Sequence, residues 1–220
     1  GKWCQHISRM VYESASRVIC ISETVRDRVL ERVKQSVLTD VVYNGVNSEM
    51  FHPSDGNSHA TSILCVGNLI PSKGQDLLLK AFAQIHPQFP GLSCEIIGDG
   101  PALPALLKIA ADLSLSSRVI FSGRKSRLEV AEAMRKCTVF ALPSTYEGLG
   151  CVYLEAMASG KAAIGCRGQG IAEVIEHGAN GWLVEPGDTQ DLAFSLSSLL
   201  ENQTLRNEIG TQARNSILQN

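Results

Sequence analysis

Short apolar runs alternate with helical stretches from residue 62 onward, and this alternation constrains the fold more than any other feature of the chain. The runs lack polar alternation, which is typical of strands buried on both faces, and the helical stretches between them require parallel strands. The sequence therefore predicts an α/β fold with a doubly wound, Rossmann-like parallel sheet, whose ligands bind beyond the carboxyl ends of the strands. The predicted strands are 63–66, 94–97, 119–121, 139–142, 162–165 and 182–184, and the predicted helices are 75–84, 103–113, 128–136, 151–159, 192–200 and 205–218.

The first fifty residues carry a shorter pattern of the same kind. Apolar runs at 18–21 and 41–43 predict two strands, and a helix is predicted at 10–16. Ser22 is a suitable N-cap for a second helix from 23 to about 33. Because two short strands and their helices cannot bury their own faces, we expect them to pack against a missing N-terminal part or against the chain beyond residue 50.

A polar, turn-rich segment around residues 53–58 separates this pattern from the longer one. We therefore expect the tail of an N-terminal domain at 1–50, a linker at 51–61 and a ligand-binding domain at 62–220. The first residue is glycine, not methionine, so the chain is expected to begin inside a longer protein.

A glycine-bearing loop after the predicted strand 139–142 leads into the predicted helix 151–159. The first N–H groups of a helix have no intrahelical partner and its dipole favours an anion, so this loop predicts a phosphate site. Glu147 on the loop and Glu155 in the helix flank that site, and carboxylate oxygens suit the hydroxyl groups of a ribose and a sugar. The alternative is an ordinary strand-to-helix connection with two solvated glutamates.

Other strand ends carry further candidates. Lys73 follows a glycine-marked loop just before a helix, where it is either a phosphate contact or a surface lysine. Gly123 and Arg124 either approach a base or phosphate or are solvated. The turn at 98–101 lacks the third glycine of the dinucleotide fingerprint and is interpreted first as structural. The loop 166–170 either lines the site or only turns the chain into a further helix, expected to open at 172–175.

Composition excludes several classes of function. The net charge of -2 shows no basic excess, so no nucleic-acid partner is expected. No apolar run approaches the roughly 20 residues of a membrane-spanning helix. The seven cysteines are scattered without a C-x-x-C pair, which favours reduced thiols in the cytosol over a zinc or redox site.

Taken together, the motifs give the chain a resemblance to the C-terminal, donor-binding half of a family 4 retaining glycosyltransferase of the GT-B fold (glycosyltransferase group 1), preceded by the end of its N-terminal domain. The most specific motif is the order Pro-Ser-x-x-Glu-Gly-x-Gly followed by Glu-Ala-Met-Ala-x-Gly, from Pro143 to Gly160. Further matching segments are 18–22, 44–46, 67–69 with 73–74, 98–101, Gly123, 172–175, Gly178 with Gly181, and 186–188.

The resemblance implies roles for single residues. Glu155 would hold the ribose hydroxyls, and Lys73 would offset the charge of the leaving diphosphate. Glu147 would contact the donor sugar near the anomeric carbon, so Glu147 and Lys73 are the implied catalytic residues. Asn68 stands where the family often has an arginine, and an amide cannot supply that charge. The implied nucleotide-sugar site is Asn68, Lys73, Gly123, Arg124, Glu147, Gly148, Leu149, Gly150 and Glu155, with the backbone of 148–150 on the diphosphate.

The activity implied by the resemblance is transfer of a hexose from a UDP- or GDP-linked sugar to an acceptor hydroxyl, with retention, in bacterial cell-surface polysaccharide or glycolipid synthesis. No Asp-x-Asp motif occurs, and neither a metal nor a cofactor is implied. The acceptor, a saccharide or lipid, would be bound by the N-terminal domain, without which the chain is expected to be inactive. The implied location is the cytoplasm, at the inner face of the membrane through peripheral contact of that domain. The alternatives are a non-catalytic nucleotide-sugar binding module and another GT-B enzyme, such as a nucleotide-sugar epimerase or a phosphorylase.

Overall fold

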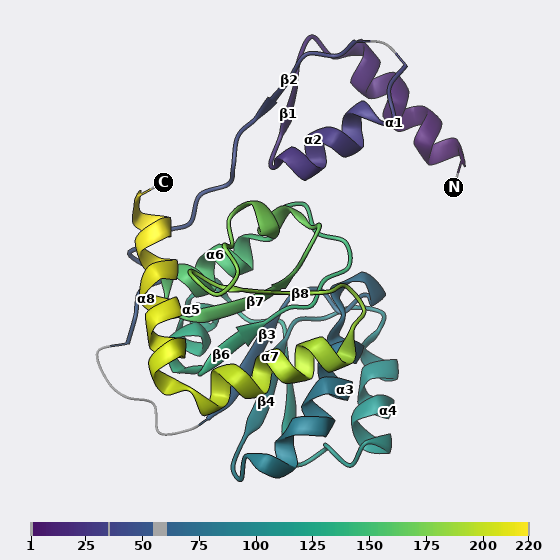
Figure 1. Ribbon diagram of the computed structural model, residues 1–220. Coiled ribbons are helices and arrows are strands. Elements are labelled where there is room, and N and C mark those ends of the chain that lie inside the picture. Colours follow the sequence, from purple (N-terminus) through teal and green to yellow (C-terminus); the bar gives the residue numbers. More distant parts are fainter. Residues whose placement is uncertain (1, 35, 55–60, 220) are drawn as a thin grey trace.

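The computed structural model describes residues 2–34, 36–54 and 61–219 (Figure 1). A six-stranded, fully parallel sheet lies at the centre of the larger part, with the strand order β5-β4-β3-β6-β7-β8. The order runs outward from β3 to β5, then returns to β6 on the other side of β3. This is the doubly wound topology that the sequence predicts. The strands are β3 (Ser62–Val66), β4 (Ser93–Ile97), β5 (Val119–Gly123), β6 (Val139–Ala141), β7 (Ala162–Cys166) and β8 (Trp182–Val184).

Two groups of packed helices cover the sheet: α3 packs on α4 and α7, and α6 packs on α5 and α8. Buried apolar side chains from both groups and from the strands form one continuous core. In it the rings of Phe140 and Tyr153 meet edge to face at 5.7 Å between centroids. The helices are α3 (Gln75–Ile85), α4 (Leu103–Asp112), α5 (Arg127–Lys136), α6 (Cys151–Ala158), α7 (Thr189–Glu201) and α8 (Gln203–Gln219).

The helix starts follow the capping signals of the sequence. Ser126 and Glu129 form a reciprocal capping box at α5, and Asp188 accepts hydrogen bonds from two backbone N–H groups at the start of α7. Each cap satisfies donors that the first turn of a helix leaves unpaired. None of the helices within the described ranges is long and apolar enough to cross a membrane.

The N-terminal part contains α1 (Lys2–Ser14), β1 (Val18–Cys20), α2 (Glu23–Leu30) and β2 (Thr39–Val41). The parallel pair β1 and β2 forms a separate two-stranded sheet, which lies at one end of the molecule in Figure 1. Ser22 caps α2 as predicted, by accepting a hydrogen bond from Val25 N. Large apolar side chains remain exposed on this part, namely Ile7, Met10, Val11, Ile19, Leu30, Leu38, Val42 and Tyr43.

Three local predictions are wrong in extent, register or type. The first helix spans Lys2–Ser14 instead of 10–16. The second strand lies at Thr39–Val41 instead of 41–43, because β1 ends at Cys20 and the last bond of the pair runs from Val42 N to Cys20 O. Residues 172–175 do not open a helix. They end a short 3-10 turn, Gly170–Glu173, because Asn180 accepts a hydrogen bond from Glu176 N and donates one to Val174 O.

The predicted linker at 51–61 falls partly on residues 55–60, which lie outside the described residues. At its start, Phe51 is fully buried in the core of the large sheet. The described start of this segment therefore packs on the larger part of the molecule.

Two glycines in the left-handed region give a test of how tightly the loops are joined. Gly74 has φ 70° and an added Cβ would lie 2.2 Å from Pro143 O, whereas Gly168 has φ 66° and open space around it. Gly168→Ala should cost only the backbone strain of about 1–2 kcal/mol. Gly74→Ala should cost about 1–3 kcal/mol more, because neighbouring backbone must move. Equal losses in urea unfolding would contradict the close approach.

Candidate active site

The loops after β3 and β6 meet where the strand order reverses, which is the usual ligand position in such sheets. Ser72 O accepts hydrogen bonds from Thr145 N at 2.9 Å and from Ser144 Oγ at 3.1 Å. Gly74 lies directly against Pro143 O because it has no side chain. These contacts fix the segment that carries Lys73 against the segment that carries Glu147.

Lys73 and Glu147, the two implied catalytic residues, form an ion pair between Nζ and Oε2. Their side chains are 17% and 12% exposed, so both charges are largely removed from water. The second carboxylate oxygen of Glu147 accepts a hydrogen bond from Gly148 N at 3.2 Å. The backbone N–H of Glu147 donates to Gln169 Oε1 at 3.0 Å. The structure thus brings together two residues that the sequence places 74 positions apart.

The segment from Gly148 to Gly150 leads directly into α6, as predicted. Gly150 is the N-cap residue with φ 79° and provides no side-chain cap. Leu149 is fully buried and anchors the loop in the core. A Cβ added at Gly150 would lie 3.1 Å from the carboxyl carbon of Glu147, so this carboxylate lies beside the N-cap of α6. The N-terminus of a helix is a position that suits an anion.

Glu155 lies in α6 and its side chain is 11% exposed. Burial raises the pKa of Glu155 above its ordinary value of 4.5, and the nearby guanidinium of Arg127 partly offsets this shift. Arg127 Nη2 lies 3.1 Å from Glu155 Oε1. The sequence gives no sign of this partner of Glu155, because Arg127 is the first residue of α5 and belongs to no motif.

The remaining predicted residues are spread along the same edge of the sheet. Asn68 is exposed after β3, and its backbone oxygen accepts a hydrogen bond from Gln75 Nε2 at 3.1 Å. Gly123 and Arg124 lie at the end of β5, two strands away from β3. The next residue, Lys125, forms an ion pair with Glu95 on β4, with 2.7 Å between Nζ and Oε1.

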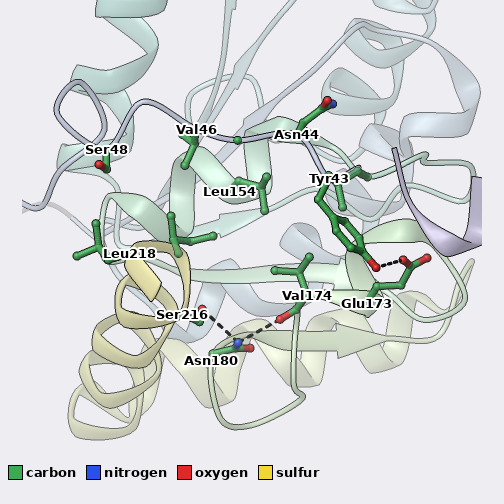
Figure 2. A pocket seen from close by; sticks show the side chains of 13 residues that line it. Tyr43, Asn44, Val46, Ser48, Leu154, Glu173, Val174, Asn180, Ser216 and Leu218 are labelled. Carbon is green, nitrogen blue, oxygen red and sulfur yellow. Dashed lines mark hydrogen bonds between the residues drawn. The ribbon is translucent and has the colours of Figure 1, made fainter. Parts of the chain in front are cut away.

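A cavity of about 690 Å³ lies beside the site loop, between residues 43–48, the turn before Val174 and the end of α8 (Figure 2). Tyr43 and Glu173 close one side through a 2.9 Å hydrogen bond, and Leu154 contributes an apolar wall. Its lining does not include Lys73, Glu147 or Glu155. The cavity is therefore separate from the ion pair. Within the ranges that the structure describes, no group of three or more His, Cys, Asp or Glu could hold a metal ion.

The family model described as "Glycosyl transferases group 1" matches residues 48–216, which include all of the candidate site. The chain belongs to this family. The fold is accordingly that of the GT-B glycosyltransferases.

Relatives and solved structures agree with this assignment. An uncharacterized glycosyltransferase of Methanocaldococcus jannaschii is 33% identical over 91% of the chain and 54% of its own length. The N-acetyl-alpha-D-glucosaminyl L-malate synthase of Bacillus anthracis is 31% identical over 96% of the chain and 57% of its own length. HepE of Anabaena, solved in complex with UDP-glucose, superposes with a TM-score of 0.89 at 27% identity, covering 98% of the chain and 63% of HepE.

The fold match extends to more distant members. The sucrose-phosphate synthase of Thermosynechococcus elongatus has a TM-score of 0.91 at 23% identity and covers the whole chain and 57% of that structure. The chain spans about half the length of the curated relatives it matches, 54% and 57% for the first two.

The environment of Glu155 predicts a measurable titration. Arg127→Ala should raise the pKa of Glu155 further, because it removes the cation that offsets burial. The carboxyl carbon of Glu155 can be followed by NMR across pH in protein labelled with ¹³C-glutamate. Arg124→Ala, which removes an exposed guanidinium from the preceding loop, is the matched control. An unchanged titration in Arg127→Ala would show that the ion pair does not form in solution.

Proposed function

We propose that this chain is the donor-binding part of a retaining hexosyltransferase that uses a UDP- or GDP-linked sugar. The observation that carries the proposal is the Lys73–Glu147 ion pair, held at the N-terminus of α6 where the strand order reverses. A cation beside a helix N-terminus suits a diphosphate, and a carboxylate beside it suits sugar hydroxyls. The complex of HepE with UDP-glucose supports a donor of this class.

Donor binding exchanges one ionic contact for another. The diphosphate takes the ammonium group of Lys73 and the first N–H groups of α6. Glu147 is thereby released from Lys73 and accepts hydrogen bonds from the donor sugar. Because the ion pair already compensates both charges, neither residue has to bear an unpaired buried charge before the donor arrives.

Glu155 is the proposed ribose ligand. Arg127 bonds to Oε1, which leaves Oε2 to accept from a ribose hydroxyl. Arg127 also favours the ionised carboxylate against the effect of burial. An ionised carboxylate accepts stronger hydrogen bonds than a neutral one, so this pairing supports nucleotide recognition.

The chemical step needs stabilisation of the departing nucleoside diphosphate. Lys73 and the dipole of α6 supply fixed positive charge where negative charge develops, which is the most effective arrangement for such a step. Glu147 positions the sugar, and substitution proceeds on the same face, so that the anomeric configuration is kept. We propose that no metal ion takes part.

The acceptor, a saccharide or lipid of a bacterial cell surface, is proposed to bind on a preceding N-terminal domain. The exposed apolar side chains on α1, β1 and α2 and beside β2 are the surface that such a domain would cover. In this proposal the enzyme works in the cytoplasm, with that domain touching the inner face of the membrane.

The phosphate role of Lys73 is tested by binding measurements. Isothermal titration with UDP-glucose and GDP-mannose should show binding to the wild type that persists in EDTA. Lys73→Ala should weaken it about 10-fold or more, since a hydrogen bond to a charged group contributes about 1.5–3 kcal/mol. Lys80→Ala, which removes a surface lysine paired with Asp76 on α3, is the control. Binding that requires a divalent metal would refute the proposed mechanism.

A second prediction concerns turnover. The 220-residue chain should bind the donor but not transfer the sugar at an enzymatic rate. Holding an acceptor against the anomeric carbon can contribute about 7–11 kcal/mol to lowering the barrier, and that contribution is assigned to the preceding domain. The assay follows nucleotide release with and without candidate acceptors. Acceptor-stimulated turnover of about 1 per second or more, the ordinary range of enzymes, would place the acceptor site within this chain.

A further inference from the structure

Arg28 on α2 reaches the loop that carries Glu147, although the two lie far apart in the sequence. Its guanidinium carbon lies 4.5 Å from the centroid of the Tyr146 ring. Nη2 donates to Gln169 Oε1 at 3.0 Å, and Nη1 lies 3.5 Å from Glu147 O. One guanidinium therefore contacts a ring, a side-chain amide and a backbone carbonyl, all within or beside the site loop.

Gln169 connects Arg28 to the backbone of Glu147. Its Oε1 accepts from Arg28 Nη2 and also from Glu147 N, both at 3.0 Å. Since both partners are donors, the oxygen and not the NH₂ group of the amide must face them. The residue is only 8% exposed, so solvent cannot readily replace either bond.

The helix that carries Arg28 is itself fixed against the donor-binding part. Ser22 Oγ donates to Gly148 O at 2.6 Å. Glu173 accepts hydrogen bonds from Glu23 N at 2.8 Å and from Thr24 N at 2.6 Å. The start of α2 is therefore bonded both to the site loop and to Glu173, and these bonds fix the helix that carries Arg28.

Arg26 and Arg28 lie on the same helix but make contacts of different kinds. Arg26 on the same helix pairs with Glu23 and Asp27, as a surface arginine commonly does. Arg28 instead extends to residues more than one hundred positions away, on the site loop and at Gln169. The contacts of Arg28 thus belong to the site and not to the surface of α2.

We propose that Arg28 is a positioning residue of the donor site, which acts through Gln169 to fix the backbone and hence the carboxylate of Glu147. The inference rests on the proposed function, because it assumes that Glu147 contacts the donor sugar. The planar guanidinium of arginine can stack on the ring and donate in two fixed directions, whereas the ammonium group of lysine is a compact charge whose donors rotate. The role predicts an effect on sugar recognition that exceeds the effect on nucleotide recognition.

Amide hydrogen exchange tests the positioning step without any ligand. Arg28→Ala and Gln169→Leu should each speed exchange at the Glu147 amide about 10-fold, because its acceptor is lost or free to turn. Gln169→Glu keeps an acceptor oxygen and should remain near the wild type. Arg26→Ala is the matched control on the same helix. Unchanged exchange in Arg28→Ala would overturn the proposal.

Binding tests the consequence for the donor. Isothermal titration compares UDP-glucose with UDP, and GDP-mannose with GDP. Arg28→Ala should weaken the sugar nucleotide several-fold more than the free nucleotide, since the sugar contact depends on Glu147. Arg28→Lys should restore only part of the difference. A double variant with Gln169→Leu should be no worse than either single variant, because both act through one connection.

The results of these experiments distinguish the proposed donor binding from the positioning role of Arg28. If the wild type binds neither nucleotides nor their sugar conjugates, the proposed function fails and the exchange measurement alone decides the role of Arg28. If the wild type binds and Arg28→Ala weakens both ligands of a pair equally, the positioning role is overturned while the proposed function stands. Faster exchange at Glu147 together with a selective loss of the sugar nucleotide supports the inference.

Discussion

The close backbone contacts at the carboxyl edge of the sheet are the constraint on which the site depends. An added Cβ would lie 2.2 Å from Pro143 O at Gly74, 1.9 Å from Gly67 O at Gly98 and 1.6 Å from Gly148 O at Gly170. Only glycine allows such approaches. The loops after β3, β4, β6 and β7 therefore pack directly against one another and form one continuous layer, here called the rim. Without this rim, Lys73 and Glu147 would not meet, because each lies on a different loop.

Charge compensation is the second common feature of the site. Each of the two glutamates at α6 is paired with a cation from another element: Glu147 with Lys73, and Glu155 with Arg127. Both carboxylates are largely buried, and burial of an unpaired charge is costly. Their partners therefore allow a polar site to form inside a folded core. In the proposed function, a negatively charged donor would compete for cations that are already in place.

The sheet and most of its helices could be predicted from the sequence because their signals are local, as in the apolar strand runs and the capping box at Ser126. Local glycine and carboxylate patterns likewise predict a ligand site from the loops with Lys73 and Glu147 and from the helix with Glu155. The pairing of these residues was not predictable, since it follows from tertiary contacts. The contacts of Arg127 and Gln169 could not be predicted for the same reason. Arg127 bonds to Glu155, 28 residues away, and Gln169 bonds to Arg28, 141 residues away.

The wrong helix prediction at residues 172–175 also has its origin in tertiary contacts. Residues 172–175 have a helical pattern, but Glu173 is used to hold α2, and Asn180 satisfies the nearby backbone groups. Burial alone would raise the pKa of Glu173. The hydrogen bonds that its carboxylate accepts, among them those from Thr24, instead hold this pKa below its ordinary value of 4.5. That carboxylate therefore favours its ionised form in the folded chain, and the ionised form is the better acceptor for the N–H groups of α2. Glu173 thus joins the two-stranded part to the rim, and with the bond from Ser22 Oγ to Gly148 O it fixes α2 to the loop that carries Glu147.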